Sequence, residues 1–127
     1  MDKKMIHTSA APAAIGPYSQ AVQFGHFLFT SGQLGIIPET GERAQGVEAQ
    51  AEWSLRNIGE ILKANGMDYT DVLKTTVFVA DLADFAKVNA VYQTFFDGDF
   101  PARSCVQVAA LPKGGLVEIE CIAAKKE

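Results

Sequence analysis

The chain has 127 residues, of which 48% are hydrophobic, and it carries a net charge of −4. This length and composition predict one globular domain over residues 1–127. The acidic balance argues against a nucleic-acid partner, and the longest apolar runs, such as TTVFVA, are too short to span a membrane.

The N-terminus begins MDKK, and no continuous apolar segment follows it. We therefore expect no signal peptide, no membrane partner and a cytoplasmic location.

The first third of the chain predicts strands and loops. KMIHT (residues 4–8) is a short candidate strand, and HFLFTSGQLG (26–35) predicts a strand that runs into a glycine-punctuated loop. Between them, residues 9–22 contain two prolines and a glycine, which exclude a regular helix. PETGE (38–42) predicts a turn.

Helices and strands alternate in the next part of the chain. Apolar residues recur every three or four positions over residues 47–65, which predicts an amphipathic helix that Gly66 can end. Residues 73–80 are rich in β-branched side chains and predict a central strand. Asp81 can cap a second helix over residues 82–96. The apolar face expected for that helix consists of Leu82, Phe85, Val88, Tyr92 and Phe95.

Two more strands, over residues 104–109 and 117–123, end the chain with the turn LPKGG between them. This order predicts an α+β fold in which both helices pack on one face of a mixed sheet. Yet Phe27 and Phe29 alternate with Leu28, so the strands are apolar on both faces. Because the helices cover only one face, we expect a homo-oligomer.

The last predicted strand, VEIECIA, alternates apolar residues with Glu118 and Glu120. A half-buried strand shows this alternation, and its polar side is normally solvated. From this stretch alone, both glutamates are expected to face water.

Arg103 differs from the other two arginines because its sequence surroundings are uncharged. Two interpretations stay open for it: an ion pair with Glu118 or Glu120, which the spacing favours, or a bound ligand carboxylate. Arg43 and Arg56 lie in polar surroundings and are expected to be surface charges.

Neither the cysteines nor the histidines indicate a metal site. Cys105 and Cys121 fall within predicted strands without a CxxC spacing, so we expect reduced, buried thiols. His7 and His26 are far apart and match no metal-binding pattern.

Four other residues are candidates for contacts with a small ligand. Tyr18 follows a Gly-Pro corner, and Ser31 and Gly32 follow a strand, where a hydroxyl and backbone amides can meet a polar ligand. Asn89 lies beside an apolar stripe and can reach toward a partner subunit. The alternatives are a core aromatic for Tyr18 and a surface amide for Asn89.

Four segments together resemble the reactive intermediate deaminase family, also called RidA or YjgF: APAAIGPYSQAV, FTSGQLG, KTTVFVADLADFAKVNAVYQTFF and FPARSCVQVAALPKGGLVEIECIA. The resemblance implies a chorismate-mutase-like subunit that forms homotrimers with ligand clefts between subunits. It also implies an enzyme that needs no cofactor. Such an enzyme hydrolyses 2-iminopropionate and 2-iminobutanoate, which arise from enamines such as 2-aminoacrylate, to 2-keto acids and ammonia.

The resemblance also implies roles for individual residues. Arg103 binds the substrate carboxylate, Glu118 activates water, and Tyr18 contacts the ligand beside them. Glu120 keeps its structural interpretation. The substrate-binding residues implied are Ser31, Gly32, Asn89 and Cys105, the last through its backbone.

Three positions depart from patterns common in the family. Gln107 and Ala110 stand where many members have an acid and a base, which predicts the loss of a compensated pair outside the catalytic residues. Gly35 stands where many members have proline, which predicts a looser loop beside the cleft and an altered substrate range.

Two other functions are alternatives to the deaminase. In one, the same cleft of a non-catalytic trimer senses a 2-keto acid; this function needs Arg103 but not Glu118. The other, RNA cleavage, fits poorly with the acidic charge and the lack of a histidine pair.

Overall fold

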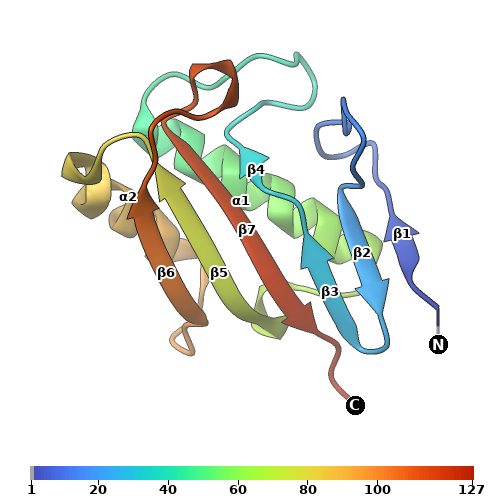
Figure 1. Cartoon of the computed structure of the whole chain (residues 1–127). Helices are drawn as coiled ribbons and strands as arrows, with labels where there is room; N and C mark the ends of the chain where they lie inside the picture. The colour runs from blue at the N-terminus through green and yellow to red at the C-terminus, as the bar shows by residue number, and fades with distance from the viewer. Residues whose placement is uncertain (1) are drawn as a thin grey trace.

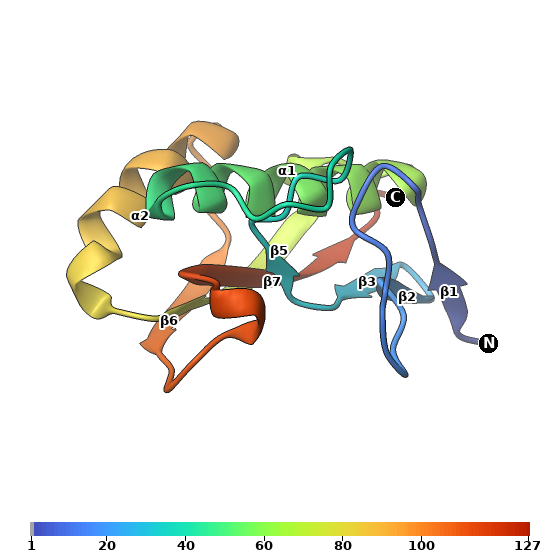
Figure 2. The same cartoon turned by 90° about the horizontal axis from the view of Figure 1, so that it is seen from above.

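The computed structural model, which describes residues 2–127, has one mixed β-sheet with two α-helices on one of its faces (Figures 1 and 2). The strand order is β1-β2-β3-β7-β5-β6, and β4 also pairs with β7. The pair β5–β6 is parallel, and the other pairs within the described residues are antiparallel. The predicted α+β class and the placement of both helices are confirmed. The elements are β1 (Lys4–Ile6), β2 (Ala21–Phe24), β3 (Phe27–Thr30), β4 (Gln33–Leu34), α1 (Val47–Ala64), β5 (Val72–Val79), α2 (Phe85–Tyr92), β6 (Ala102–Gln107) and β7 (Val117–Ala124).

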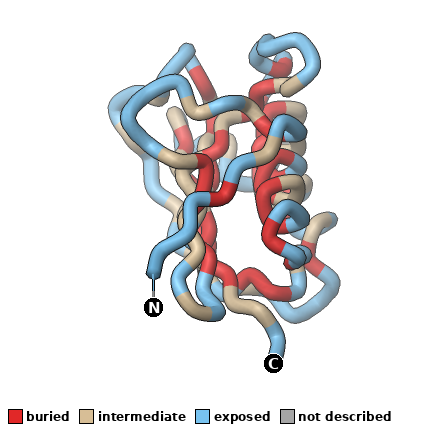
Figure 3. The backbone as a smooth tube through the Cα atoms, turned by 90° about the vertical axis from the view of Figure 1, so that its right-hand side faces the viewer, coloured by how far each residue is buried: buried red, intermediate tan, exposed pale blue. Residues whose placement is uncertain are grey.

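Helix α1 packs on the sheet through the apolar stripe that the sequence predicted. The residues of this stripe are all buried: Val47, Ala51, Leu55, Ile58 and Leu62. In Figure 3 the buried residues lie along the facing sides of the sheet and the helix layer. The helix ends at Ala64, and Gly66 takes the positive φ of 69° that suits a glycine after a helix. No helix within residues 2–127 has the length and apolar character needed to cross a membrane.

The second helix is shorter than predicted. Regular α-helix covers only Phe85–Tyr92, and a 3₁₀ turn flanks it on each side. Asp81 caps the first 3₁₀ turn and not the α-helix. After the helix, the Thr94 hydroxyl donates to the carbonyl of Val91 at 2.7 Å, a local bond that competes with continued helix.

The apolar face predicted for this helix is only partly buried. Val88 and Tyr92 are buried as expected, whereas Leu82 and Phe85 are 46% and 41% exposed. The backbone N–H of Leu82 donates to Oε1 of Gln107. Gln107, one of the positions that depart from the family pattern, therefore holds the start of the helical segment.

Strand β6 covers Ala102–Gln107, two residues earlier than predicted, so Arg103 lies inside the strand and not before it. Its parallel pairing with β5 starts at the pair Lys74–Ala102, and a local sequence pattern cannot reveal such a long-range register.

Successive side chains of strand β7 point alternately to the two faces of the sheet. Val117, Ile119, Cys121 and Ala123 are at most 3% exposed and lie in the core with α1, whereas Glu118, Glu120 and Ile122 lie on the open face. Three phenylalanines of the neighbouring strands share that open face and are each 46% exposed: Phe24, Phe27 and Phe29. An apolar, helix-free face of this kind is the basis for expecting an oligomer.

Gly35, directly after β4, is buried against α1. A Cβ at this position would lie 2.4 Å from the Cα of Gln50. The buried Gln50 side chain also bonds both neighbouring segments, because its Nε2 donates to the Ala44 carbonyl and its Oε1 accepts from the Leu116 N–H. Gly35 therefore permits close packing of loop and helix, and the expectation that it loosens the loop is wrong.

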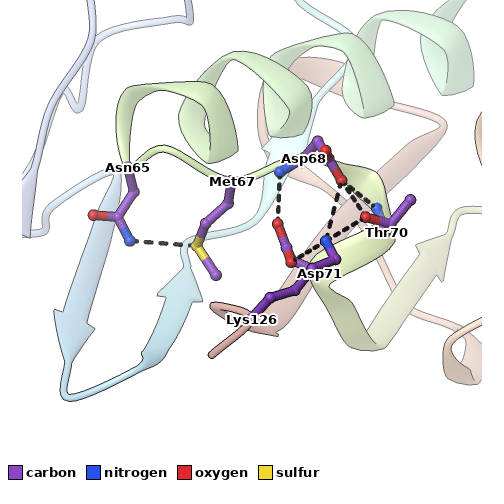
Figure 4. A network of polar contacts seen from close by, with 6 residues as sticks. All are labelled: Asn65, Met67, Asp68, Thr70, Asp71 and Lys126. Carbon is purple, nitrogen blue, oxygen red and sulfur yellow. Dashed lines mark hydrogen bonds and ion pairs between the residues drawn. The ribbon is translucent and has the colours of Figure 1, made fainter.

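The C-terminal end of β7 is attached to the turn that precedes β5 (Figure 4). Nζ of Lys126 lies 2.6 Å from Oδ1 of the buried Asp71. The Asp71 carboxylate also accepts from the N–H of Asp68, and Asp68 caps the turn in return. Lys126 thus links the two segments.

We expect Gly35→Ala to lower the free energy of unfolding by about 2 kcal/mol or more, because its Cβ meets the backbone of α1. Urea denaturation measures the difference. Gly41→Ala is the control: a Cβ there meets nothing within 4 Å, so its positive φ is expected to cost only about 1 kcal/mol. Equal losses in both variants would contradict the packing argument.

Candidate active site

Glu118 lines a small cavity where β4 meets β7. We call it the Glu118 cavity; its volume is about 120 Å³, below the roughly 300–1,000 Å³ of sites for drug-sized ligands. Its lining includes Tyr18, Gly32, Leu34 and Lys113. Glu118 and Lys113 are the only charged residues among those that line it.

The position of Glu118 is fixed from three sides. Its backbone pairs with Leu34 of β4 and with Phe78 of β5. Its side chain lies close to Gly32, where an added Cβ would be 2.7 Å from the carboxyl carbon Cδ. Any side chain at position 32 would therefore displace the carboxyl group or be displaced by it.

Burial raises the pKa of Glu118, and the negative charge of Glu120 on the same face of β7 raises it further. A raised pKa brings a carboxylate closer to the range in which it works as a general base near neutral pH. The half-buried Glu118 is thus no ordinary solvated acid.

Tyr18 reaches the cavity from the loop between β1 and β2. Its side chain is 51% exposed, so Tyr18 is not a core aromatic. The buried Gln20 organises this loop: its Nε2 donates to the carbonyls of Thr8 and Pro12, and its Oε1 accepts from the Thr8 N–H. Nothing in the sequence pattern distinguished Gln20 as the residue that shapes this wall.

Ser31 lies beside Gly32 but outside the lining of the cavity. Its hydroxyl donates to the carbonyl of Ser19 at 2.6 Å. This bond ties the end of β3 to the Tyr18 loop, and the hydroxyl oxygen keeps lone pairs for a ligand.

Arg103 extends from β6 toward α2. Its Nη1 donates to Oδ1 of Asn89 at 2.8 Å, and its guanidinium carbon lies 4.8 Å from the ring centroid of Tyr92 and 5.4 Å from that of Phe85. The Tyr92 hydroxyl in turn bonds Oγ1 of Thr75 at 2.6 Å, which fixes the ring. The sequence indicated Tyr92 only as a core residue, so this stacking was missed.

Asn89, Tyr92 and Arg103 line a second cavity of about 350 Å³, which we call the Arg103 cavity. No carboxylate within residues 2–127 forms an ion pair with Arg103. The ion pair with Glu118 or Glu120 that the spacing favoured is therefore wrong. With one of its five N–H donors used on Asn89, the guanidinium retains donors for a carboxylate.

Cys105 follows Arg103 by two residues and lies on the same face of β6. Burial raises the pKa of its thiol, and the positive charge of Arg103 offsets part of that rise. Burial also raises the pKa of the Cys121 thiol to about 12. Both cysteines are free, as predicted, and protonated thiols of this kind are poor nucleophiles.

The two cavities lie on opposite faces of one sheet. Arg103 pairs with Thr75, and Thr75 with Cys121, both buried on the helix side. Glu118 pairs with Phe78 on the open side. The structure thus groups the predicted residues into two half-sites: Tyr18, Gly32 and Glu118 with Ser31 nearby, and Asn89 and Arg103 with Cys105 nearby.

A larger cavity of about 570 Å³ lies beside α1 and contains none of the predicted site residues. Its arginine, Arg56, pairs with Glu52 at 2.9 Å and lies 4.8 Å from the ring centroid of Trp53. Arg56 is thus a paired surface charge, as expected.

The sequence model of the family described as Endoribonuclease L-PSP matches residues 8–125. Reactive Intermediate Deaminase A, chloroplastic, from Arabidopsis thaliana is 55% identical over 122 residues, which are 95% of this chain and 65% of that protein. The 2-iminobutanoate/2-iminopropanoate deaminase of Salmonella typhimurium is 53% identical over 126 residues, with 97% of this chain and 98% of that protein covered.

Solved structures agree with these sequence matches. The crystal structure of E. coli TdcF with bound serine superposes with a TM-score of 0.94 at 50% identity and covers 97% of this chain and 99% of that one. The resemblance noted in the sequence is confirmed over almost the whole domain. The chain therefore belongs to the reactive intermediate deaminase (RidA/YjgF) family, which the matching sequence model describes as Endoribonuclease L-PSP.

Proposed function

We propose that the protein is a cofactor-free hydrolytic deaminase of small 2-imino acids. The Salmonella relative is named a 2-iminobutanoate/2-iminopropanoate deaminase. The observation that carries this proposal is the pair of half-sites. One has a half-buried carboxyl group with a raised pKa. The other has a guanidinium that Asn89 orients and that has no acidic partner among residues 2–127. Together they supply a base for water and an anchor for a carboxylate.

The reaction adds water across the C=N bond of a 2-imino acid. Glu118 takes a proton from the attacking water, and the oxygen bonds to the imine carbon. The proton taken by Glu118 passes to the imine nitrogen, which gives a carbinolamine. Its hydroxyl proton then moves to the nitrogen as the C–N bond breaks, which leaves a 2-keto acid and ammonia. Arg103 holds the substrate carboxylate with two parallel hydrogen bonds, a geometry that lysine cannot reproduce.

The other residues of the half-sites have supporting roles in this proposal. Asn89 and the ring of Tyr92 fix the orientation of the Arg103 guanidinium. Tyr18 and Gly32 border the carboxyl group of Glu118, and Gly32 leaves room for it. Cys105 contributes through its backbone beside Arg103, and its protonated thiol takes no part.

We infer that the complete site forms between subunits of a homotrimer. Within one chain the sheet separates Arg103 from Glu118, so a second copy has to supply one of them. The exposed phenylalanines of the open face are an apolar surface that such an assembly would cover. A cytoplasmic location stays a prediction, since the Arabidopsis relative is named chloroplastic.

Two other functions have less support. A 2-keto acid sensor would need Arg103 but gives no reason for a half-buried acid beside Gly32. RNA cleavage, which the family description names, conflicts with the net charge of −4, since RNA-binding surfaces are basic.

We expect Glu118→Gln to lower kcat for 2-imino acid hydrolysis about a hundredfold or more, since it removes the general base. Binding of 2-oxobutanoate, measured by calorimetry, should persist in this variant and weaken in Arg103→Lys. Substrate is generated with an amino-acid oxidase, and semicarbazide traps the imine that remains. Arg56→Lys is the control for the arginine change. Full turnover by Glu118→Gln would exclude Glu118 as the base, whereas a parent that binds 2-oxobutanoate without hydrolysing the imine would favour the sensor.

A mixture of two inactive variants tests the inter-subunit site. When Arg103→Ala and Glu118→Gln subunits assemble at random in equal amounts, about a quarter of the sites combine an intact Glu118 with an intact Arg103 from its neighbour. Purification through two different tags removes the oligomers of a single variant. Each remaining trimer has one intact site of three, so we expect about a third of the parental activity. Mixed oligomers without activity would show that both residues act within one subunit.

The position of the acid limb of the pH–rate profile should depend on the charge of Glu120, because that charge raises the pKa of Glu118. The base works when Glu118 is deprotonated, so activity falls as the pH drops through its pKa. Glu120→Gln removes a negative charge that raises this pKa, so the acid limb should move to lower pH. Profiles of kcat/KM for both proteins measure the shift. A limb that moves to higher pH would contradict the assignment of Glu118.

A further inference from the structure

The turn between β6 and β7 forms one wall of the Glu118 cavity through Pro112 and Lys113. Lys113 has a φ of 57°, a left-handed conformation that is strained for any residue other than glycine. A strained tip at a cavity wall requires contacts from the surrounding structure to hold it.

Arg43 provides those contacts. Its Nη1 donates to the carbonyl oxygens of Lys113 at 2.6 Å and of Gly114 at 2.9 Å. The approach is close, because a Cβ at Gly114 would lie 2.6 Å from Nη1. Arg43 is exposed, as expected from the sequence, and it also bonds a turn that is 70 residues away in the chain.

The backbone of Arg43 is itself fixed. Arg43 forms a β-bridge with Ile36, which also lines the Glu118 cavity. The next residue, Ala44, donates its N–H to the carbonyl of Gly35, and Gly35 packs against α1. A continuous rigid support thus runs from α1 through this loop to the tip of the turn.

The base of the turn is held independently of Arg43. The buried Gln50 accepts from the N–H of Leu116, and Glu118 is paired with both β4 and β5. Loss of the Arg43 guanidinium would therefore release the tip, Pro112–Gly114, and leave the catalytic carboxyl group in place.

We propose that Arg43 is a positioning residue that holds the 112–114 tip against the Glu118 cavity and thereby limits the size of the 2-imino acid side chain that the site accepts. This inference rests on the proposed deaminase function. The lining of the cavity also includes the apolar side chains of Ile15 and Leu34, which suit an aliphatic substituent. The part of the site that one chain forms has a volume of about 120 Å³, which favours a small substituent.

The test compares a small and a bulky substrate. An amino-acid oxidase generates the 2-imino acids of alanine and leucine, and semicarbazide trapping gives kcat/KM for each. We expect Arg43→Met to lower the alanine-to-leucine ratio of kcat/KM about tenfold, since pocket walls discriminate side chains on this scale. Arg43→Lys should restore part of the ratio because an ammonium group can donate to the same carbonyls. The matched control is Arg56→Met, on the exposed side of α1, which should keep the parental ratio.

The outcomes separate this inference from the proposed function. An unchanged ratio in Arg43→Met, with an active parent, overturns the role of Arg43 and leaves the deaminase intact. A parent that hydrolyses neither substrate overturns both. If Arg43→Met does not fold, Gly114→Ala tests the same contact, because its Cβ would push Nη1 away from the turn. Gly41→Ala, which also has a positive φ but no neighbour for its Cβ, is the control for backbone strain. An equal loss of activity on both substrates would indicate a merely structural role and would also overturn the inference.

Discussion

The alternation of side chains along β7 is the constraint on which the site depends. This strand is bonded to β3 and β4 on one side and to β5 on the other. Its four odd-numbered residues fill the core, and burying a large apolar side chain contributes about 1.5–3 kcal/mol. A slip of one residue would bring Glu118 and Glu120 into the core and expose the apolar set. That cost far exceeds any gain from hydrating one carboxyl group, so core packing determines where the acid lies.

The same alternation on the parallel neighbours β5 and β6 directs Arg103 to the other side of the sheet. There the residue lies at the edge of the sheet, where α2 supplies an amide and an aromatic ring. A guanidinium held by a neutral amide and a π-face keeps its positive charge uncompensated, which is the state that recruits a carboxylate. Glu118 and Arg103 lie on opposite faces of the sheet, so one subunit cannot form the proposed site without another copy.

Buried amides connect these strands to the loops around the Glu118 cavity. Gln20 bonds four backbone groups of the Tyr18 loop, and Gln50 joins the loop before α1 to the start of β7. A buried amide left without partners costs about 1–3 kcal/mol, so each glutamine specifies one arrangement of its loop. The loops that form the walls of the Glu118 cavity are therefore held in one conformation by these buried amides.

Composition and periodicity by themselves determined the α+β class, the apolar stripe of α1, the central strand β5 and the alternation of β7, because each depends on residues close together in the chain. Family motifs in the sequence also indicated Arg103 and Glu118. Only the tertiary structure decided the earlier start of β6, the short α2, the packing of Gly35 and the partners of Arg103 and Arg43. These features depend on strand register and on contacts between segments up to 71 residues apart, and a local pattern carries no information on such distances. The same register places Arg103 and Glu118 on opposite faces of the sheet.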